Sequence, residues 1–97
     1  MTPADLRSLL RDSLLLWDVD ATTAIDGTGV AIQATDGTYH VAPASPDLRP
    51  ARWFLQTPDR ATANRPPRAM PSIVALLSAL RNALGAARGA RLRVGAG

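Results

Sequence analysis

The sequence of 97 residues contains no cysteine, no lysine and no glutamate, and it has a single histidine. The absence of cysteine excludes a disulfide framework and a thiolate zinc site, and one histidine cannot form a two-histidine metal site within one chain. No uninterrupted apolar run approaches the ~20 residues of a membrane-spanning helix. We expect a chain of this length to form one domain and not a multidomain enzyme.

The N-terminal residues, Met1 to Asp5, lack the positively charged and apolar regions of a signal peptide. We therefore expect a soluble cytoplasmic protein without a membrane partner. The composition is rich in alanine and arginine, with 18 Ala and 11 Arg residues, which is typical of a GC-rich genome and predicts a bacterial source. Leu, Ile, Val and Phe together supply only 22 residues, so we expect a folded but lean core that oligomerisation could supplement.

The charges are segregated along the chain. Residues 1–48 hold seven Asp and two Arg, a net charge of −5, whereas residues 49–97 hold nine Arg and one Asp, a net charge of +8. Such asymmetry indicates an acidic or nucleic-acid partner for the basic half, or two halves that attract each other within the fold or in a dimer. The second interpretation is the simpler one.

The first half of the chain predicts a helix followed by an antiparallel meander. Thr2 is a helix cap before Pro3, and leucines at helical spacing predict a helix over about 3–14. From residue 17 to 25 the apolar side chains alternate with polar ones, as they do again in 30–34 and 39–41. Asp-Gly pairs at 26–27 and 36–37 separate these runs and predict hairpin turns.

The second half predicts a proline-rich connection and a helix. Seven of the eight prolines fall within residues 43–71, where the proline-free segment 52–56 could add a fourth strand at an edge. Residues 58–71 are expected to form a long connection. Pro71 and Ser72 open an amphipathic helix that Gly85 or Gly89 should end, so we expect a single domain over 1–90 and a frayed tail over 91–97.

These elements predict an α+β fold: an N-terminal helix, a three- or four-stranded antiparallel β-meander, a Pro-rich connection and a C-terminal amphipathic helix, with both helices on one sheet face. The periodicities also predict which side chains form the core. The expected core residues are Trp17, Val19, Ile25, Ile32, Val41, Leu55, Ile73, Leu76, Leu77 and Leu80.

Two carboxylates follow an apolar run in the first half. Leu14 to Thr22 reads as an apolar strand followed by Asp-x-Asp-x-Thr, which resembles the first motif of the haloacid-dehalogenase phosphatases. That resemblance implies a phosphotransfer enzyme in which Asp18 is the nucleophile and Asp20 the acid and base. Those enzymes are larger doubly wound α/β domains with a downstream cation and a late acidic pair. The same residues partly imitate a calcium loop, although glycine and glutamate are missing at two defining positions.

The basic half offers the stronger interpretation. Arginine, tryptophan and a stiff proline-rich loop are favoured at protein interfaces, so we expect a small non-enzymatic protein-binding domain, an adaptor or a self-associating homodimer, that uses segment 49–71. Single-stranded nucleic-acid binding by the same segment is the alternative, and an enzyme built on Asp18 and Asp20 is the third. We expect no cofactor, no metal and no catalytic residue. The predicted partner-binding residues are Arg49, Arg52, Trp53, Phe54, Arg60, Arg65 and Arg68.

Overall fold

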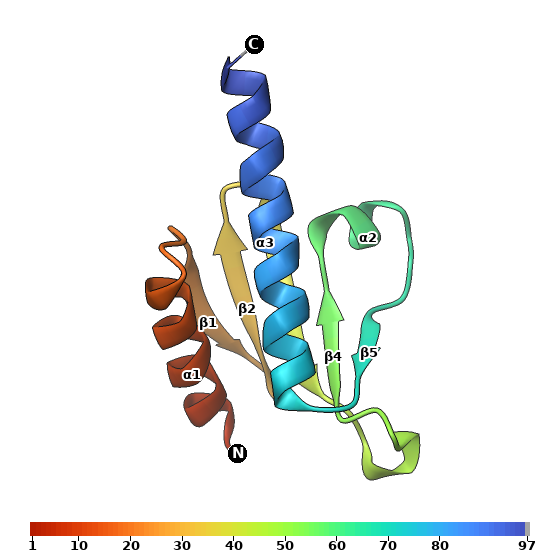
Figure 1. Ribbon diagram of the computed structural model, residues 1–97. Helices are drawn as coiled ribbons and strands as arrows, with labels where there is room; N and C mark the ends of the chain where they lie inside the picture. The colour runs from red at the N-terminus through yellow and green to blue at the C-terminus, as the bar shows by residue number, and fades with distance from the viewer. Residues whose placement is uncertain (97) are drawn as a thin grey trace.

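A computed structural model describes the backbone of residues 1–96 and the side chains of residues 1–85. One long helix precedes the strands in the chain and another follows them (Figure 1). A short 3-10 helix and a short α-helix lie between the later strands. The elements are α1 (Pro3–Leu16), β1 (Thr22–Asp26), β2 (Gly29–Ala34), β3 (Gly37–Pro43), η1 (Pro46–Leu48), β4 (Trp53–Gln56), α2 (Pro58–Thr62), β5 (Arg68–Met70) and α3 (Ile73–Ala96).

The strands form one antiparallel sheet in the order β1-β2-β3-β4-β5. Helix α1 packs against β1 and β2, and α3 packs against β4 and β5. Both helices lie on the same face of the sheet (Figure 1). The predicted α+β class, the antiparallel meander and the placement of the helices are therefore confirmed.

Helix α1 begins with a capping box. The backbone N–H of Asp5 donates to the Thr2 hydroxyl over 3.1 Å, and the backbone N–H of Thr2 donates to the Asp5 carboxylate over 3.1 Å. The hydrogen bond from the Thr2 backbone, together with that from the Thr2 side chain, lowers the pKa of Asp5. The start of the helix is thus fixed by the residues that the sequence indicated.

The end of α1 corrects the predicted first strand, which does not begin at Trp17. The helix continues to Leu16 and ends in a chain reversal where Asp18 adopts a left-handed φ of 56°. The N–H of Val19 bonds to the carbonyl of Leu14 over 2.9 Å, and the N–H of Asp18 to that of Leu15 over 3.2 Å. These two bonds form a Schellman motif. Residues 17–19, which the alternating pattern assigned to a strand, therefore belong to the end of the helix.

The first predicted hairpin turn is confirmed. Asp26 pairs with Gly29, so two residues connect β1 and β2, and Gly27 at the first of them has φ of 61°. Glycine at this position is typical of the tight turns whose twist matches the flanking strands. The register that follows places Ile32 opposite Tyr39 and directs both toward the helices.

The sheet has one strand more than predicted. Strand β4 matches the predicted fourth strand but is not an edge strand, because β5 pairs with it along the outer side. The expected connection over 58–71 therefore contains both α2 and β5. Strand β5 has three residues, which is too short to show a period of two, and it directly follows two prolines.

Helix α3 is capped by Ser72, whose hydroxyl accepts a hydrogen bond of 3.1 Å from the N–H of Ala75. Neither Gly85 nor Gly89 ends the helix, which runs to Ala96. Glycine weakens a helix by roughly 1 kcal/mol but does not force it to stop. Residues 91–96 have a helical backbone, and the expected fraying of this tail stays a prediction. Residue 97 lies outside the described part of the chain, and the domain boundary at residue 90 stays a prediction.

The core lies between the sheet and the two helices. Of the predicted core residues, Ile32, Val41, Leu55, Leu76 and Leu80 are buried, whereas Trp17, Val19, Ile73 and Leu77 are only partly buried at its margin. The prediction for Ile25 was wrong, because this residue is 47% exposed on the edge strand β1. The buried hydrophobic residues are Leu6, Leu10, Leu14, Val30, Ile32, Tyr39, Val41, Leu55, Met70, Leu76, Leu80 and Leu84.

Candidate functional site

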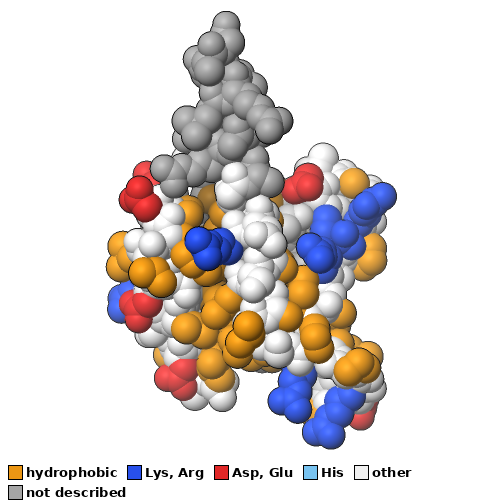
Figure 2. All heavy atoms as spheres, viewed as in Figure 1, with side chains coloured by type: hydrophobic (Ala, Val, Ile, Leu, Met, Phe, Trp, Pro, Cys, Tyr) orange, Lys and Arg blue, Asp and Glu red, His pale blue; other side chains and the backbone are white. Residues whose placement is uncertain are grey.

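The predicted partner-binding residues separate into two basic groups and one isolated aromatic residue. Figure 2 shows arginine side chains over α2 and β5 and, apart from these, over the loop that contains η1. Arg60, Arg65 and Arg68 line a pocket of about 440 Å³. Arg49, Arg52 and Trp53 line another pocket of about 310 Å³ beside η1. Phe54 lines neither pocket.

The two aromatic residues of β4 point in opposite directions. Trp53 is partly buried against the core and pairs with Met70, whereas the next residue, Phe54, pairs with Ala69. Successive side chains of a strand alternate between the two faces of the sheet. Phe54 therefore lies on the face that the helices do not cover, and the two rings do not share a surface.

The larger pocket is formed where several elements meet. Strand β3 and the turn before it supply two residues, α2 and its cap supply three, the segment that ends in β5 supplies two, and α3 supplies one. The lining residues are Asp36, Tyr39, Thr57, Asp59, Arg60, Arg65, Arg68 and Ala83. Because these residues are far apart in sequence, the pocket exists only in the folded chain.

Tyr39 and Thr57 are the buried residues of this pocket. The Tyr39 hydroxyl donates a hydrogen bond of 2.6 Å to Oδ2 of Asp36. Burial, and then the hydrogen bond to Asp36, raise the pKa of the Tyr39 phenol far above its ordinary value. The phenol thus stays protonated and keeps its hydrogen bond to Asp36.

The segment that carries Arg65 is held in place by two side chains. Nε and Nη2 of Arg60 both donate to the carbonyl of Pro66, over 3.1 and 2.8 Å. Nε2 of Gln56 donates to the carbonyl of Arg65 over 2.9 Å. These bonds fix the backbone of the loop, so the basic wall of the pocket is ordered before any ligand arrives.

The pocket is lined by three guanidinium groups and by two carboxylates, those of Asp36 and Asp59. Within residues 1–85, none of these arginines lies within 4.0 Å of a carboxylate oxygen; such close approaches are made instead by Arg11 to Asp12 and by Nδ1 of His40 to Oδ2 of Asp26. An anionic ligand therefore does not have to displace a salt bridge. Sequence reasoning identified the three arginines through their charge but missed Asp36, Tyr39 and Thr57, for which the sequence gives no local signal.

The structure around Asp18 and Asp20 differs from the phosphatase motif. Leu14 to Leu16 belong to a helix, not to a strand, and the sheet is antiparallel where the resemblance implied a doubly wound domain. Within the described residues, no three His, Asp, Glu or Cys side chains are grouped so that they could hold a metal ion. The same residues include no helix that is long and apolar enough to cross a membrane.

Comparison of the chain with models of known protein families, with curated proteins and with solved structures finds no match.

Proposed function

We propose that this chain is a non-enzymatic protein-binding domain that recognises an acidic segment of a partner protein at the pocket lined by Arg60, Arg65 and Arg68. The observation that supports this proposal is the set of three guanidinium groups on one pocket without carboxylate partners among residues 1–85. Guanidinium groups bind carboxylates through paired hydrogen bonds, and arginine is enriched at the residues that dominate binding energy.

The pocket favours an acidic peptide over a single-stranded nucleic acid. Binding of single strands combines arginines with exposed aromatic rings on which bases stack. Here Tyr39 is 1% exposed, and neither Trp53 nor Phe54 lines the pocket. A nucleic acid would therefore find phosphate contacts without a stacking surface.

The proposal is tested by titrating the protein into a fluorescein-labelled peptide of alternating Asp and Gly, with an Asn/Gly peptide and oligo-dT as comparison ligands. We expect binding of the acidic peptide only, and a loss of about tenfold or more in affinity for the double variant Arg65→Ala/Arg68→Ala. The matched control is Arg49→Ala/Arg52→Ala, which removes the same charge from the other basic group and should change the affinity less than about threefold.

Tighter binding of oligo-dT than of the acidic peptide, at matched salt concentration, would assign the pocket to nucleic acid. Equal losses in the two double variants would show that binding follows net charge and not this pocket. Absence of binding to every ligand would contradict recognition of acidic segments.

A further inference from the structure

The two edges of the sheet are unlike each other. Strand β5 closes one edge with three residues that directly follow Pro66 and Pro67. Strand β1 forms the other edge with five residues, and its register with β2 is continuous from Thr22 to Asp26, without a bulge. Proteins protect edge strands by proline, charged side chains, bulges, shortness or a covering helix or loop. Strand β1 has no proline, no basic side chain and no bulge, its one charged residue, Asp26, lies at its end, and α1 packs against it.

The outer side of β1 is open among the described residues. Four of its five residues are exposed, and Thr23 is partly exposed. Apart from the pairing with β2, no backbone group of Thr22–Asp26 makes a hydrogen bond within this part of the chain. In an antiparallel ladder every second residue directs its N–H and C=O away from the neighbouring strand, so β1 presents unpaired donors and acceptors.

Several exposed apolar side chains belong to the elements on this side of the sheet. Within residues 1–85, six large hydrophobic side chains are exposed, and four of them belong to α1, β1 or the residue at the chain start. Leu15 and Leu16 are 73% and 84% exposed at the end of α1, and Ile25 is 47% exposed on β1. In Figure 1, α1 and β1 lie together on the side of the molecule opposite to β5.

We propose that β1 pairs with β1 of a second copy of this chain, antiparallel and about a two-fold axis at Ala24. This register joins Ala24 to Ala24 of the second copy, Thr23 to Ile25 and Thr22 to Asp26. It is the antiparallel register that pairs all five residues of both strands, and it places the helix-covered faces of the two sheets on the same side. The result is a continuous ten-stranded sheet.

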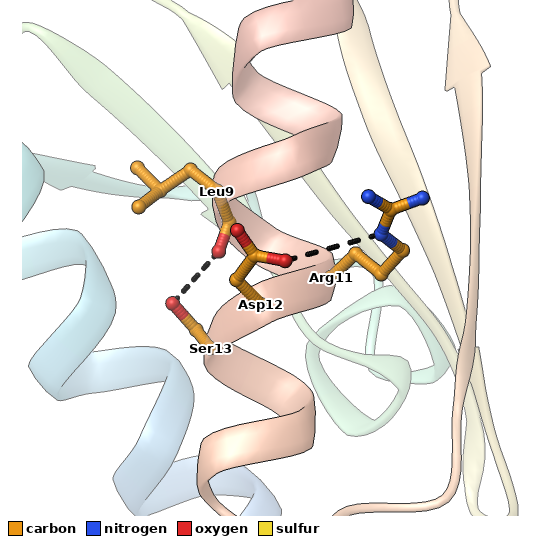
Figure 3. Close-up of polar contacts among 4 residues, drawn as sticks. All are labelled: Leu9, Arg11, Asp12 and Ser13. Atoms are coloured by element: carbon orange, nitrogen blue, oxygen red, sulfur yellow. Dashed lines mark hydrogen bonds and ion pairs between the residues drawn. The ribbon is translucent and has the colours of Figure 1, made fainter.

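The charges near this edge are compatible with a second copy. Asp26, the charged residue of β1, meets Thr22 of the other strand and not a second carboxylate. On α1, Arg11 extends from the side opposite to Leu9 and Ser13, with its Nε 4.0 Å from Oδ1 of Asp12 (Figure 3). The outer side of α1 therefore carries both positive and negative charges. Two copies that approach through this side do not meet as surfaces of a single charge.

The lean composition gives the pairing a physical reason. A domain of this size buries a modest fraction of its surface, and Leu, Ile, Val and Phe supply only 22 of its 97 residues. Pairing satisfies the edge donors and acceptors and removes apolar side chains such as Ile25 from water. The surface lies at the edge opposite to β5, so this inference is independent of the arginine pocket.

The test measures sedimentation equilibrium of the whole chain over a wide range of concentrations. We expect a monomer–dimer equilibrium whose Kd rises at least about tenfold in Ile25→Lys, because a lysine on the edge opposes pairing. Leu48→Lys is the matched control, since Leu48 is 50% exposed near η1 and the charge change is identical. Circular dichroism establishes that both variants are folded.

A cysteine series tests the register without depending on that variant, because the chain has no native cysteine. Ala24→Cys places two thiols opposite each other and should form a covalent dimer on mild oxidation. Thr22→Cys should not, since four residues of extended strand separate the two thiols by about 13 Å along the strand direction. A monomer at every concentration, a dimer equally weakened by Leu48→Lys, or equal cross-linking of the two cysteine variants would each overturn the proposal.

Discussion

The hydroxyl of Tyr39 lies 2.6 Å from Oδ2 of Asp36 and donates a hydrogen bond to it, beneath the arginines of the larger pocket. Tyr39 is 1% exposed, so its ionisation would place a phenolate next to a carboxylate in a poorly solvated position. The chain has no other tyrosine, no lysine and no cysteine, so in the unfolded chain this phenol is the side chain that titrates between about pH 9 and pH 12, whereas in the folded protein its raised pKa keeps it protonated there.

This arrangement predicts a specific loss of stability in alkali. Because the pKa of Tyr39 is raised in the folded state, the protonated phenol stabilises the fold. This stabilisation is fully present below about pH 10 and is lost as the pH rises above it. We expect the free energy of unfolding to fall by up to about 1.4 kcal/mol per pH unit above pH 10. Tyr39→Phe should lose about 1 kcal/mol at pH 7 and show no such alkaline decline. Urea unfolding followed by circular dichroism from pH 8 to 12 measures both effects, and parallel declines in the two proteins would contradict this account.

Two positions in the first turn of α3, two residues apart, test how the helix packs on the sheet. Leu76 is fully buried and Val74 is 70% exposed. Leu76→Ala should destabilise the protein by about 2–5 kcal/mol, because it removes a core side chain and leaves a cavity. Val74→Ala should change the stability by less than about 0.5 kcal/mol. Chemical unfolding measures the change in the free energy of unfolding of each variant. Similar losses of stability in the two variants would mean that α3 is rotated relative to the orientation described.

Two glycines predict opposite effects of the same substitution. A Cβ atom at Gly29 would overlap the carbonyl oxygen of Val41 in the neighbouring strand, whereas one at Gly85 would meet nothing within 4 Å. Gly29→Ala should therefore cost about 1–3 kcal/mol, and Gly85→Ala should stabilise α3 by about 0.5–1 kcal/mol. Thermal unfolding measures both shifts, and a stabilising Gly29→Ala would show that β2 and β3 do not approach as closely as described.

The fold was largely predictable from the sequence because its long elements carry clear periodicity and turn signals. The leucines of α1 and α3 repeat at helical spacing, and an Asp-Gly pair closes the first hairpin. The predicted strand from Trp17 failed because a few alternating residues also fit a helix end, and the left-handed Asp18 that decides between them is set by backbone hydrogen bonds. Strand β5 was missed because its pairing with β4 is not encoded in a local pattern.

The candidate site was predictable only in part. Charge and composition identified the arginines, but they could not show that Arg49 and Arg52 lie at a different pocket from Arg65 and Arg68. That division depends on the path of the chain through α2 and on the reversal at Asn64, which has a left-handed φ of 57°. The pairing of Tyr39 with Asp36 likewise depends on the geometry of the β2–β3 turn.

The most direct test of recognition at the arginine pocket is an NMR titration that follows the arginine Nε–Hε signals while the Asp/Gly peptide is added. We expect the signals of Arg60, Arg65 and Arg68 to shift and saturate together, while those of Arg49 and Arg52 move little. Larger shifts at Arg49 and Arg52, or small unsaturated shifts spread over all arginines, would contradict recognition at this pocket.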